Sequence, residues 1–357
     1  MNSHNLKDLR DRIDEINRQL LSLLNERTAI VQQVGAEKEK HGIKKYDPVR
    51  EQQIIAELRT LNTGPMSDEM MIHIFKEIFK VSVKLQEEEN KEKNLLVSRD
   101  TQSENTQIEV DGETIGDGEA TLIFGPCSVE SLEQVEAVAQ NMEAKGLKFI
   151  RGGAFKPRTS PYDFQGLGFE GLEILHHVAK KYDLRVVSEI MDAGDLEAAL
   201  PFVDIVQIGA RNMQNFTLLK AVGQIKKPVL LKRGLSATLE EFVNAAEYIM
   251  SHGNREVILC ERGIRTFEKA TRNTLDISAV PILKKETHLP VFVDITHSTG
   301  RRDILLPIAN ASLAVGADGI MAEVHPMPEL ALSDANQQMS LETFDEFYEN
   351  LHLVNKK

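Results

Sequence analysis

Residues 229–260 read VLLKRGLSATLEEFVNAAEYIMSHGNREVILC, and they decide the fold class. The stretch begins with a short apolar run that ends at Lys232, continues through a helical segment, and finishes with a second apolar run that ends at Cys260. Short apolar runs separated by helices are typical of parallel strands that are buried on both faces. This stretch therefore predicts one β-α-β unit.

The same unit repeats from residue 120 onward. Eight apolar runs predict eight strands, at Thr121–Gly125, Lys148–Arg151, Arg185–Glu189, Asp204–Ile208, Val229–Lys232, Glu256–Cys260, Val291–Ile295 and Gly319–Ala322. Eight such units in about 230 residues favour a (β/α)8 TIM barrel, and a doubly wound open sheet is the lesser alternative. Just before them, the turn signal in Val110-Asp111-Gly112-Glu113 predicts a short β-hairpin.

Residues 1–90 show only helical periodicity, which predicts a small all-α domain of three helices. Apolar residues recur every three or four positions along the first helix, as in a helix that packs on another helix: Leu6, Leu9, Ile13, Ile16, Leu20, Leu23, Ile30 and Val34. Arg27 in this helix and Ser82 in the third helix occupy slots where the pattern calls for an apolar residue. A domain of this size cannot cover so long a helix, so we expect it to dimerise.

The domain order follows from these two patterns. We expect the helical domain at residues 1–90, a linker at residues 91–106 and the barrel domain at residues 107–357. Asp47-Pro48, a cap followed by a first-turn proline, marks the start of the second helix.

The composition excludes several classes of protein. The 357 residues are 41% hydrophobic and 27% charged, and their net charge of −13 argues against a nucleic-acid partner and an anionic membrane surface. We expect neither a signal peptide nor a membrane span, because no apolar run approaches the roughly 18 residues that a span needs. Two cysteines are too few for a disulfide framework, so we expect a cytoplasmic protein.

Each predicted strand is followed by a charged or metal-capable residue. These residues are Cys127, Arg151, Glu189, Arg211, Lys232, Arg262, His297 and Glu323. In a TIM barrel the chemistry lies where strands end and the following loops begin, so we expect these side chains to meet at one rim.

The rim residues divide into two chemical sets. Cys127, His297 and Glu323, joined by Asp334 from the last loop, predict a site for a divalent transition metal that acts as a Lewis acid. The cations predict substrates that carry several negative charges: Arg151, Lys156, Arg158, Arg211, Lys232 and Arg262. The segment GLGFEG at residues 166–171 matches the sequence fingerprint of a dinucleotide-binding site. A polar loop precedes it where that motif requires a strand, so we expect a loop and no dinucleotide site there.

These motifs resemble the synthases that condense phosphoenolpyruvate with erythrose 4-phosphate to 3-deoxy-D-arabino-heptulosonate 7-phosphate (DAHP), at the start of aromatic amino-acid biosynthesis. The resemblance covers about residues 107–345, and the following motifs carry it: GPCS (125–128), RGGAFKPRTS (151–160), QIGARN (207–212), LKRG (231–234), CERG (260–263), DITHS (294–298) and AEVH (322–325).

The resemblance implies a role for each rim residue. It implies Cys127, His297, Glu323 and Asp334 as metal ligands, with Mn²⁺ the first candidate metal. The implied substrate-binding residues are Arg151, Lys156 and Lys232 on the reacting end of phosphoenolpyruvate, Arg211 and Arg262 on its phosphate, and Arg158 and Thr159 on the sugar phosphate. Lys156 is also the candidate proton donor. Pro157 favours erythrose 4-phosphate over the arabinose 5-phosphate of a sister family, and another metal-dependent aldolase remains the alternative.

Residues 5–88 resemble the all-helical chorismate mutases, which convert chorismate to prephenate. The positions that match that family's active site are Arg10, Arg27, Lys38, Asp47, Arg50, Glu51, Ser82 and Gln86. The resemblance implies that Arg27 and Arg10 of the partner subunit clamp carboxylates, and that Lys38 and Gln86 face the ether oxygen. It further implies a homotetramer with dimerised mutase domains and feedback inhibition of the synthase by chorismate or prephenate. A helical domain that only senses these ligands is the alternative.

Overall fold

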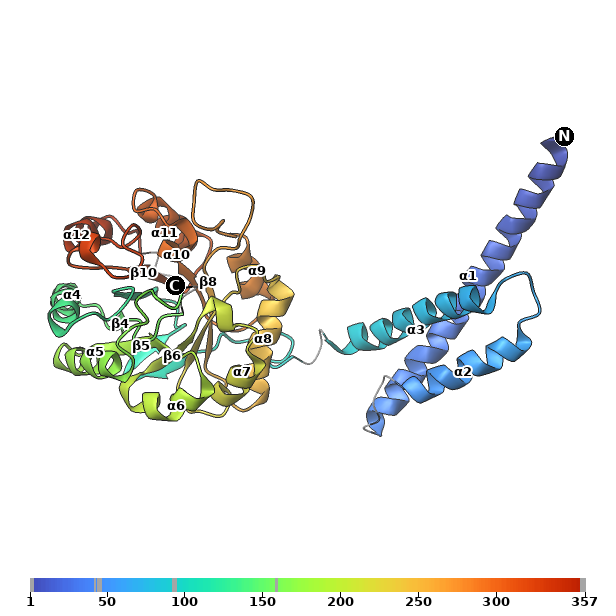
Figure 1. Ribbon diagram of the computed structural model, residues 1–357, viewed down its shortest axis with the longest axis horizontal. Helices are drawn as coiled ribbons and strands as arrows, with labels where there is room; N and C mark the ends of the chain where they lie inside the picture. Colours follow the sequence, from blue (N-terminus) through green and yellow to red (C-terminus); the bar gives the residue numbers. More distant parts are fainter. Residues whose placement is uncertain (1–2, 42, 44–46, 92–94, 158–159, 354–357) are drawn as a thin grey trace. The chain divides into compact units, whose positions relative to one another are not determined.

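The computed structural model describes residues 3–41, 43, 47–91, 95–157 and 160–353, with the side chains of residues 3, 4, 39 and 86–91 outside this description. The chain divides into two compact units, Met1–Asn94 and Leu95–Lys357. The first unit is built of helices and the second is a barrel (Figure 1). Among the described residues, no helix combines the length and the apolar character that crossing a membrane requires.

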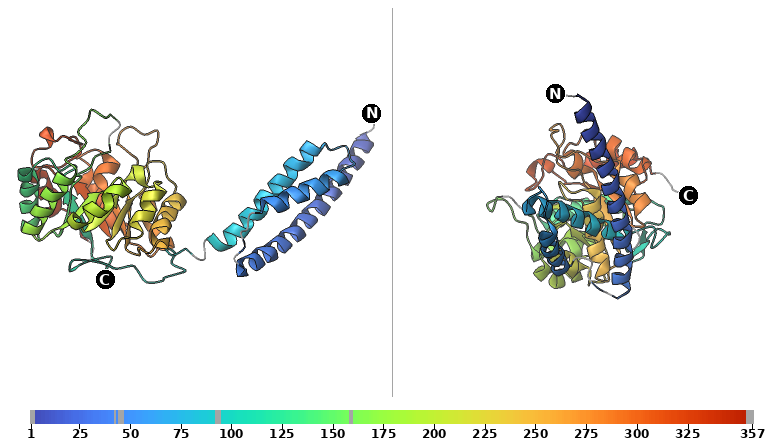
Figure 2. Two further views of the ribbon diagram at one scale, coloured as in Figure 1. Left: turned by 60° about the horizontal axis from the view of Figure 1, so that its bottom comes forward. Right: turned by 90° about the vertical axis from the view of Figure 1, so that its right-hand side faces the viewer.

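Three helices form the first unit: α1 (Ser3–Lys40), α2 (Pro48–Leu61) and α3 (Asp68–Lys91). Helix α3 contacts both α1 and α2 (Figure 2). As expected, Asp47 caps α2, and its carboxylate accepts a hydrogen bond from the Arg50 backbone N at 3.0 Å. The eight apolar residues of the α1 pattern, from Leu6 to Val34, are each between 45% and 62% exposed in this single chain. The first unit therefore leaves the packing face of its longest helix uncovered.

The second unit is a closed barrel of eight parallel strands. In chain order they are β3 (Thr121–Gly125), β4 (Phe149–Arg151), β5 (Arg185–Glu189), β6 (Ile205–Ile208), β7 (Val229–Lys232), β8 (Val257–Glu261), β9 (Val291–Asp294) and β10 (Gly319–Glu323), and β10 pairs with β3 to close the ring. Each observed strand begins and ends within one residue of its predicted bounds. The TIM barrel is confirmed, and the open-sheet alternative is wrong.

Helices cover the outside of the barrel (Figure 1). They are α4 (Leu132–Ala144), α5 (Phe169–Lys181), α6 (Ala193–Ala199), α7 (Phe216–Val222), α8 (Leu239–Ser251), α9 (Ala279–Glu286), α11 (Leu305–Ala314) and α12 (Leu341–Glu349). The short helix α10 (Ile295–Thr299) instead follows the end of β9 directly. Their apolar faces and the outward side chains of the strands form one large core, in which Phe124 and Phe242 are fully buried. Local signals start these helices: Thr238 and Glu241 form a reciprocal capping box at α8.

A small hairpin closes the N-terminal end of the barrel. Strands β1 (Ile108–Val110) and β2 (Glu113–Ile115) pair around a turn in which Asp111 and Gly112 have φ of 47° and 87°. Ile108, Val110 and Ile115 are buried in a second core with inward-facing barrel residues. The expected hairpin is therefore present, and it seals the bottom of the barrel.

Residues 95–106, expected to be part of a linker, instead pack along the barrel. Val97 is fully buried, and Ser98 forms an isolated antiparallel bridge with Thr287. Thr106 Oγ1 lies 2.6 Å from His288 Nδ1. The segment shows no periodicity in the sequence because its single buried valine and its short polar contacts are too few to form a repeating pattern. It is a strap that belongs to the second unit.

Candidate active sites

The four metal-capable residues come from neighbouring parts of the barrel. Cys127 follows β3, Glu323 ends β10, and Asp334 lies in the loop after β10. His297 lies in α10, directly after β9. Because β10 pairs with both β3 and β9, the ends of these three strands meet on one side of the barrel mouth.

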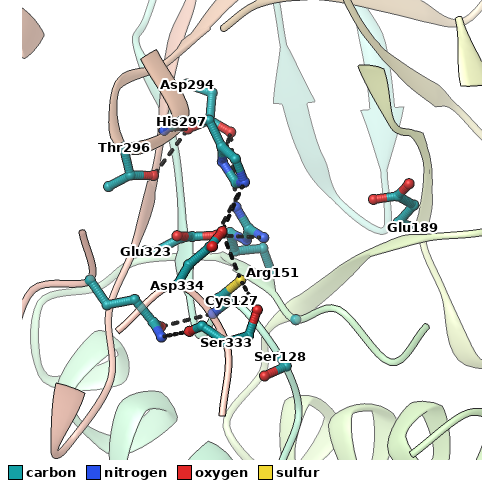
Figure 3. Close-up of polar contacts among 12 residues, drawn as sticks. Cys127, Ser128, Arg151, Glu189, Asp294, Thr296, His297, Glu323, Ser333 and Asp334 are labelled. Atoms are coloured by element: carbon teal, nitrogen blue, oxygen red, sulfur yellow. Dashed lines mark hydrogen bonds and ion pairs between the residues drawn. The ribbon is translucent and has the colours of Figure 1, made fainter. Parts of the chain in front are cut away.

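The side chains of these four residues converge (Figure 3). The ligand atoms of Cys127, Glu323 and Asp334 all lie within 4.8 Å of one another. His297 Nε2 lies 3.6 Å from Glu323 Oε1 and 3.7 Å from Asp334 Oδ2. Glu189, which ends β5, lies apart from this group in Figure 3. Three of the strand-end groups, joined by Asp334, thus form one cluster, and Glu189 is not part of it.

Burial and neighbouring charges set the ionisation of the cluster. Burial raises the pKa of the Cys127 thiol to about 12. Burial also disfavours ionised Asp334, but Arg272 and His297 outweigh it and hold the pKa of this carboxyl well below its usual range. The pKa of Glu323 is lowered as well, because neighbouring cations outweigh its burial. The cluster therefore presents two carboxylates beside a thiol.

This donor set fits a divalent transition metal. Oε1 of Glu323 is buried and has no hydrogen-bond partner, although Arg151 Nη2 lies 3.2 Å away. A buried carboxylate oxygen with an unused acceptor position is well suited to bind a cation. Thiolate, imidazole and carboxylate ligands together suit borderline transition metals better than Ca²⁺ or Mg²⁺.

Asp294 orients His297. This buried carboxylate ends β9 and accepts hydrogen bonds from His297 Nδ1 at 2.8 Å and from the His297 backbone N at 3.0 Å. The first bond fixes the proton on Nδ1 and turns Nε2 toward Glu323. Asp294 also forms an ion pair with Lys232. This role was not predicted from the sequence, because the predicted strand ran one residue too far, to Ile295.

Two consecutive glutamines hold the other three members of the cluster. Gln337 Nε2 donates hydrogen bonds to the carboxylates of Glu323 and Asp334, the latter at 3.2 Å. Gln338 Oε1 accepts a hydrogen bond from the Cys127 backbone N at 2.9 Å, and its Nε2 donates at 2.8 Å to a backbone carbonyl beside Asp334. Both glutamines are buried. Neither residue type nor spacing marks such amides in the sequence.

Five of the six predicted cations lie at the same end of the barrel, and four of them are buried or half-buried: Arg151, Lys156, Lys232 and Arg262. Lys156 Nζ lies 3.1 Å from Cys127 Sγ, and Arg151, Lys232 and Arg262 are each only 4% exposed. Nε and Nη1 of Arg151 are buried without a hydrogen-bond partner among the described residues. Burial lowers the pKa of Arg262, so its charge is not fully compensated by its neighbours. Buried cations with unused donors favour the binding of an anion.

The other predicted residues of the barrel site are more exposed or are not described. Arg211 lies in the 3-10 turn Ala210–Asn212 after β6 and is exposed. It lines a cavity of about 190 Å³ together with Gly234 and Glu241. Arg158 and Thr159 lie outside the described residues.

In the helical unit, the two polar residues of the apolar pattern meet. Arg27 Nη1 donates a hydrogen bond to Ser82 Oγ at 2.6 Å, and the Arg27 guanidinium lies 5.7 Å from the centre of the Phe79 ring. Arg27 and Ser82 line a groove of about 580 Å³ between α1 and α3. Burial lowers the pKa of Arg27. This groove can accept a small anion.

Five further residues predicted for this site do not line the groove in the described single chain: Arg10, Lys38, Asp47, Arg50 and Glu51. Asp47 caps α2, and Arg50 Nη1 lies 3.5 Å from Gln53 Oε1. Arg10 is exposed on α1, and Lys38 is half-buried near the end of that helix. The Gln86 side chain lies outside the described residues.

Comparison with known proteins assigns both units. Residues 96–356 match the model of the DAHP synthetase I family. The chain belongs to the DAHP synthetase I family. Residues 9–87 match the model of chorismate mutase type II. This member of the DAHP synthetase I family therefore carries a chorismate mutase-type domain ahead of its barrel.

Relatives of this DAHP synthetase I member cover the barrel. A phospho-2-dehydro-3-deoxyheptonate aldolase of Thermotoga maritima is 56% identical over 256 residues, which cover 72% of this chain and 76% of the relative. The solved structure of a truncated 3-deoxy-D-arabino-heptulosonate 7-phosphate synthase of Thermotoga maritima is 52% identical with a TM-score of 0.67, covering 71% of this chain and 93% of that one. A 2-dehydro-3-deoxyphosphooctonate aldolase of Granulibacter bethesdensis is 34% identical over 243 residues, covering 63% of this chain and 85% of the relative.

These matches confirm the family predicted from the strand-end motifs, and with it the two enzyme activities, DAHP synthase and chorismate mutase. The DAHP synthetase I assignment also makes a bound metal an expected part of the barrel site, in agreement with the donor cluster. The roles of single residues remain predictions.

Proposed function

We propose that the barrel joins phosphoenolpyruvate to erythrose 4-phosphate at the barrel mouth, where the Cys127 cluster and the buried cations lie. C3 of phosphoenolpyruvate forms a bond to the aldehyde carbon, water adds at C2, and the C2–O bond to phosphate breaks. The products are DAHP and inorganic phosphate. The observation that carries this proposal is a metal-capable cluster placed beside three cations that are each 4% exposed.

Phosphoenolpyruvate matches the buried cations by charge and size. Its carboxylate is a planar oxyanion and its phosphate a tetrahedral one. Guanidinium groups bind both kinds of oxyanion through paired hydrogen bonds. Arg151 has two buried donor atoms without a hydrogen-bond partner among the described residues, and we assign it with Lys232 to the carboxylate end. We assign Arg262 and Arg211 to the phosphate of this substrate. The negative charge of the phosphate would balance the charge of Arg262, whose pKa is lowered by burial.

Cys127, His297, Glu323 and Asp334 would hold a divalent transition metal, with Mn²⁺ the first candidate. Such an ion supplies Lewis-acid polarisation of the aldehyde oxygen. Lys156 Nζ lies 3.1 Å from Cys127 Sγ, so it can reach an oxygen bound beside the thiol. We assign to Lys156 the delivery of a proton to the developing alkoxide, a general-acid role.

The choice of sugar rests on the segment 156–160, KPRTS, in which Pro157 favours the shorter aldose. Because relatives at about a third identity are named 2-dehydro-3-deoxyphosphooctonate aldolases, arabinose 5-phosphate is the competing substrate to test. Phosphate release should be faster with erythrose 4-phosphate. Faster release with arabinose 5-phosphate would reassign the barrel to the sister activity.

The helical unit is proposed to rearrange chorismate to prephenate in the groove of Arg27 and Ser82. This isomerisation needs no covalent chemistry, so positioning of two carboxylates and charge near the breaking ether bond suffice. The exposed apolar face of α1 supports pairing with a second copy, which would bring Arg10 of the partner subunit to the groove. We propose a homotetramer in which the mutase domains are paired, and inhibition of the synthase by chorismate or prephenate bound in the groove.

One experiment tests the metal and the reaction together. The full chain, treated with a chelator, should lose DAHP formation and regain it with Mn²⁺. Cys127→Ala should not recover, whereas Cys260→Ala, which removes the other buried thiol, should recover. Full activity in excess chelator would refute the metal assignment, and recovery of Cys127→Ala would remove this thiol from the ligand set.

A further inference from the structure

A buried ionic cluster lies behind the two strand ends that carry Lys232 and Arg262. Arg233 Nη1 pairs with Glu261 Oε2 at 2.8 Å and with Asp276 Oδ2 at 2.9 Å. Glu261 is fully buried and Arg233 is 4% exposed. None of these three residues belongs to the metal cluster or to the assigned substrate contacts.

The cluster is next in the chain to both assigned cations. Arg233 follows Lys232 at the end of β7, and Glu261 precedes Arg262 at the end of β8. Because successive side chains of an extended strand point to opposite faces, the ionic pair lies on the other side of the barrel wall from the two cations. Lys232 pairs with the inward-facing Asp294, which agrees with this arrangement.

Backbone hydrogen bonds tie the cluster to the same two strand ends. The Arg233 backbone N donates to the Cys260 carbonyl at 3.0 Å, and the Gly263 backbone N donates to Glu261 Oε1 at 2.7 Å. The Arg233 side chain also donates through Nε to the Ala237 carbonyl at 3.0 Å. The chain on both sides of Lys232 and Arg262 is therefore fixed by groups of this cluster.

Stability alone gives little reason for such a cluster. Burying charges carries a desolvation penalty, and apolar residues of similar size are often as stable or more stable in the same place. An ionic pair is directional, unlike an apolar contact, because charge-assisted hydrogen bonds hold atoms at defined distances and angles. In this cluster, the fixed geometry determines where the side chains of Lys232 and Arg262 point.

We propose that Arg233, Glu261 and Asp276 are positioning residues that aim Lys232 and Arg262 at phosphoenolpyruvate. The inference rests on the proposed function, in which these two cations bind that substrate. Loss of the cluster then weakens phosphoenolpyruvate binding and leaves binding of the aldose, which is assigned to other residues, close to normal.

The test uses Glu261→Gln, which keeps the side-chain shape but removes the charge. Phosphoenolpyruvate binding is measured by calorimetry on the Mn²⁺-loaded full chain without aldose, so no turnover occurs. We expect roughly ten-fold weaker phosphoenolpyruvate binding. Misplacement of an oriented group by about 1 Å can lower a reaction rate about a hundred-fold, and we expect a smaller effect on binding. The KM for the aldose should change less than two-fold, on the order of measurement scatter. Asp276→Asn, which alters the more exposed member, provides a milder variant if Glu261→Gln folds poorly.

The control is an ion pair between a half-buried lysine and a buried carboxylate at the opposite end of the barrel. Lys284 Nζ donates to both carboxylate oxygens of Asp318, at 2.9 and 2.7 Å, just before β10 begins. Asp318→Asn should lower the melting temperature, as Glu261→Gln does, without weakening phosphoenolpyruvate binding.

Three outcomes oppose the proposal in distinguishable ways. If folded Glu261→Gln binds phosphoenolpyruvate as tightly as the wild type, the cluster has a purely structural role. The same conclusion applies to Asp276→Asn if that variant is used instead. An equal rise in the dissociation constant of phosphoenolpyruvate and the KM of the aldose would indicate general loosening of the barrel. Equally weakened phosphoenolpyruvate binding in Asp318→Asn would indicate the same. Absence of phosphoenolpyruvate binding to the wild-type chain would instead refute the proposed function.

Discussion

Gln338 ties the thiol of the metal-capable cluster to the loop that supplies its carboxylate. Its side-chain amide serves two backbone groups, the Cys127 N at 2.9 Å and the Ser333 carbonyl at 2.8 Å. We predict that Gln338→Ala lowers the free energy of unfolding by about 1–3 kcal/mol, because both groups stay buried without a partner. It should also weaken Mn²⁺ binding by roughly 10–100-fold, since the two ligand loops lose their link.

The matched control for Gln338 is Asn254, another buried amide that serves backbone groups, just before β8. Asn254→Ala should cause a similar loss of stability in denaturant unfolding and leave the Mn²⁺ dissociation constant unchanged. Equal metal affinity in Gln338→Ala and wild type would show that the amide has no part in the site.

His288 makes the strap of residues 95–106 sensitive to pH. Its Nε2 lies 2.6 Å from the Leu96 carbonyl, which only accepts, so Nε2 carries the proton and Nδ1 accepts from Thr106 Oγ1. Burial lowers the pKa of His288. The unfolded chain, with a pKa of about 6.5, therefore binds a proton more readily than the folded one, so this residue's contribution to stability is complete above about pH 6.5 and falls below it.

We therefore predict that the melting temperature of the wild type falls more than that of His288→Gln between about pH 7.5 and about pH 5.5. The comparison between the two proteins removes the contribution of every other titrating group. Parallel curves for the two proteins would show that His288 does not couple the strap to pH.

Sequence reasoning finds charged residues of the candidate site more readily than amides. Cys127, His297 and Glu323 follow strand ends, where a barrel collects its chemistry, so topology alone brought them together. Gln337 and Gln338 lie in an irregular loop, and their partners are backbone atoms or carboxylates whose positions depend on the folded loop. No local pattern predicts such contacts.

Among the elements, α1 has the most unusual surface. The apolar residues of its pattern are about half exposed in the single chain, which is costly in water unless another surface covers them. We predict that Ile13→Glu, in the middle of this face, disrupts pairing of the full chain's helical domains. It should abolish chorismate mutase activity and leave DAHP formation largely intact.

Analytical ultracentrifugation of the full chain provides the measurement for Ile13→Glu. Asn17→Glu adds the same charge at an exposed polar position of the same helix and should leave assembly unchanged. An unchanged sedimentation coefficient and unchanged mutase turnover in Ile13→Glu would show that this face of α1 is not an interface.

Element boundaries were predictable where one physical signal dominates. The barrel strands are continuous apolar runs because both of their faces are buried, and their observed ends lie within one residue of the predicted ones. The strap of residues 95–106 was misassigned because it is held by separate contacts, such as Arg99 N to the Glu286 carbonyl at 3.0 Å, rather than by a repeating pattern.

At the level of the whole molecule, one chain carries two enzymes of one pathway. We predict that prephenate inhibits DAHP formation by the full chain, and that deletion of residues 1–94 leaves an active but insensitive barrel. The barrel unit has its own core, and a truncated relative has a solved structure, so the deleted form is expected to fold. Inhibition requires that prephenate binds more tightly to the inhibited arrangement, with typical couplings of about 1–3 kcal/mol.

A point variant tests the same coupling in the intact chain. Arg27→Ala removes the half-buried cation of the helical groove and should also abolish the response to prephenate in a synthase assay. Equal inhibition of the wild type, Arg27→Ala and the deleted form would place the effector site in the barrel.

The hairpin β1–β2 closes the N-terminal end of the barrel with Ile108, Val110 and Ile115, so the interior is open to solvent at the C-terminal end of the strands. Two substrates and two products must then pass through the same opening. Three of the cations assigned to phosphoenolpyruvate, Arg151, Lys232 and Arg262, are each only 4% exposed, so an aldose bound above them would obstruct the entry of phosphoenolpyruvate. We therefore expect ordered binding, with phosphoenolpyruvate first and the aldose second, and we expect a large excess of aldose to slow turnover in a steady-state assay.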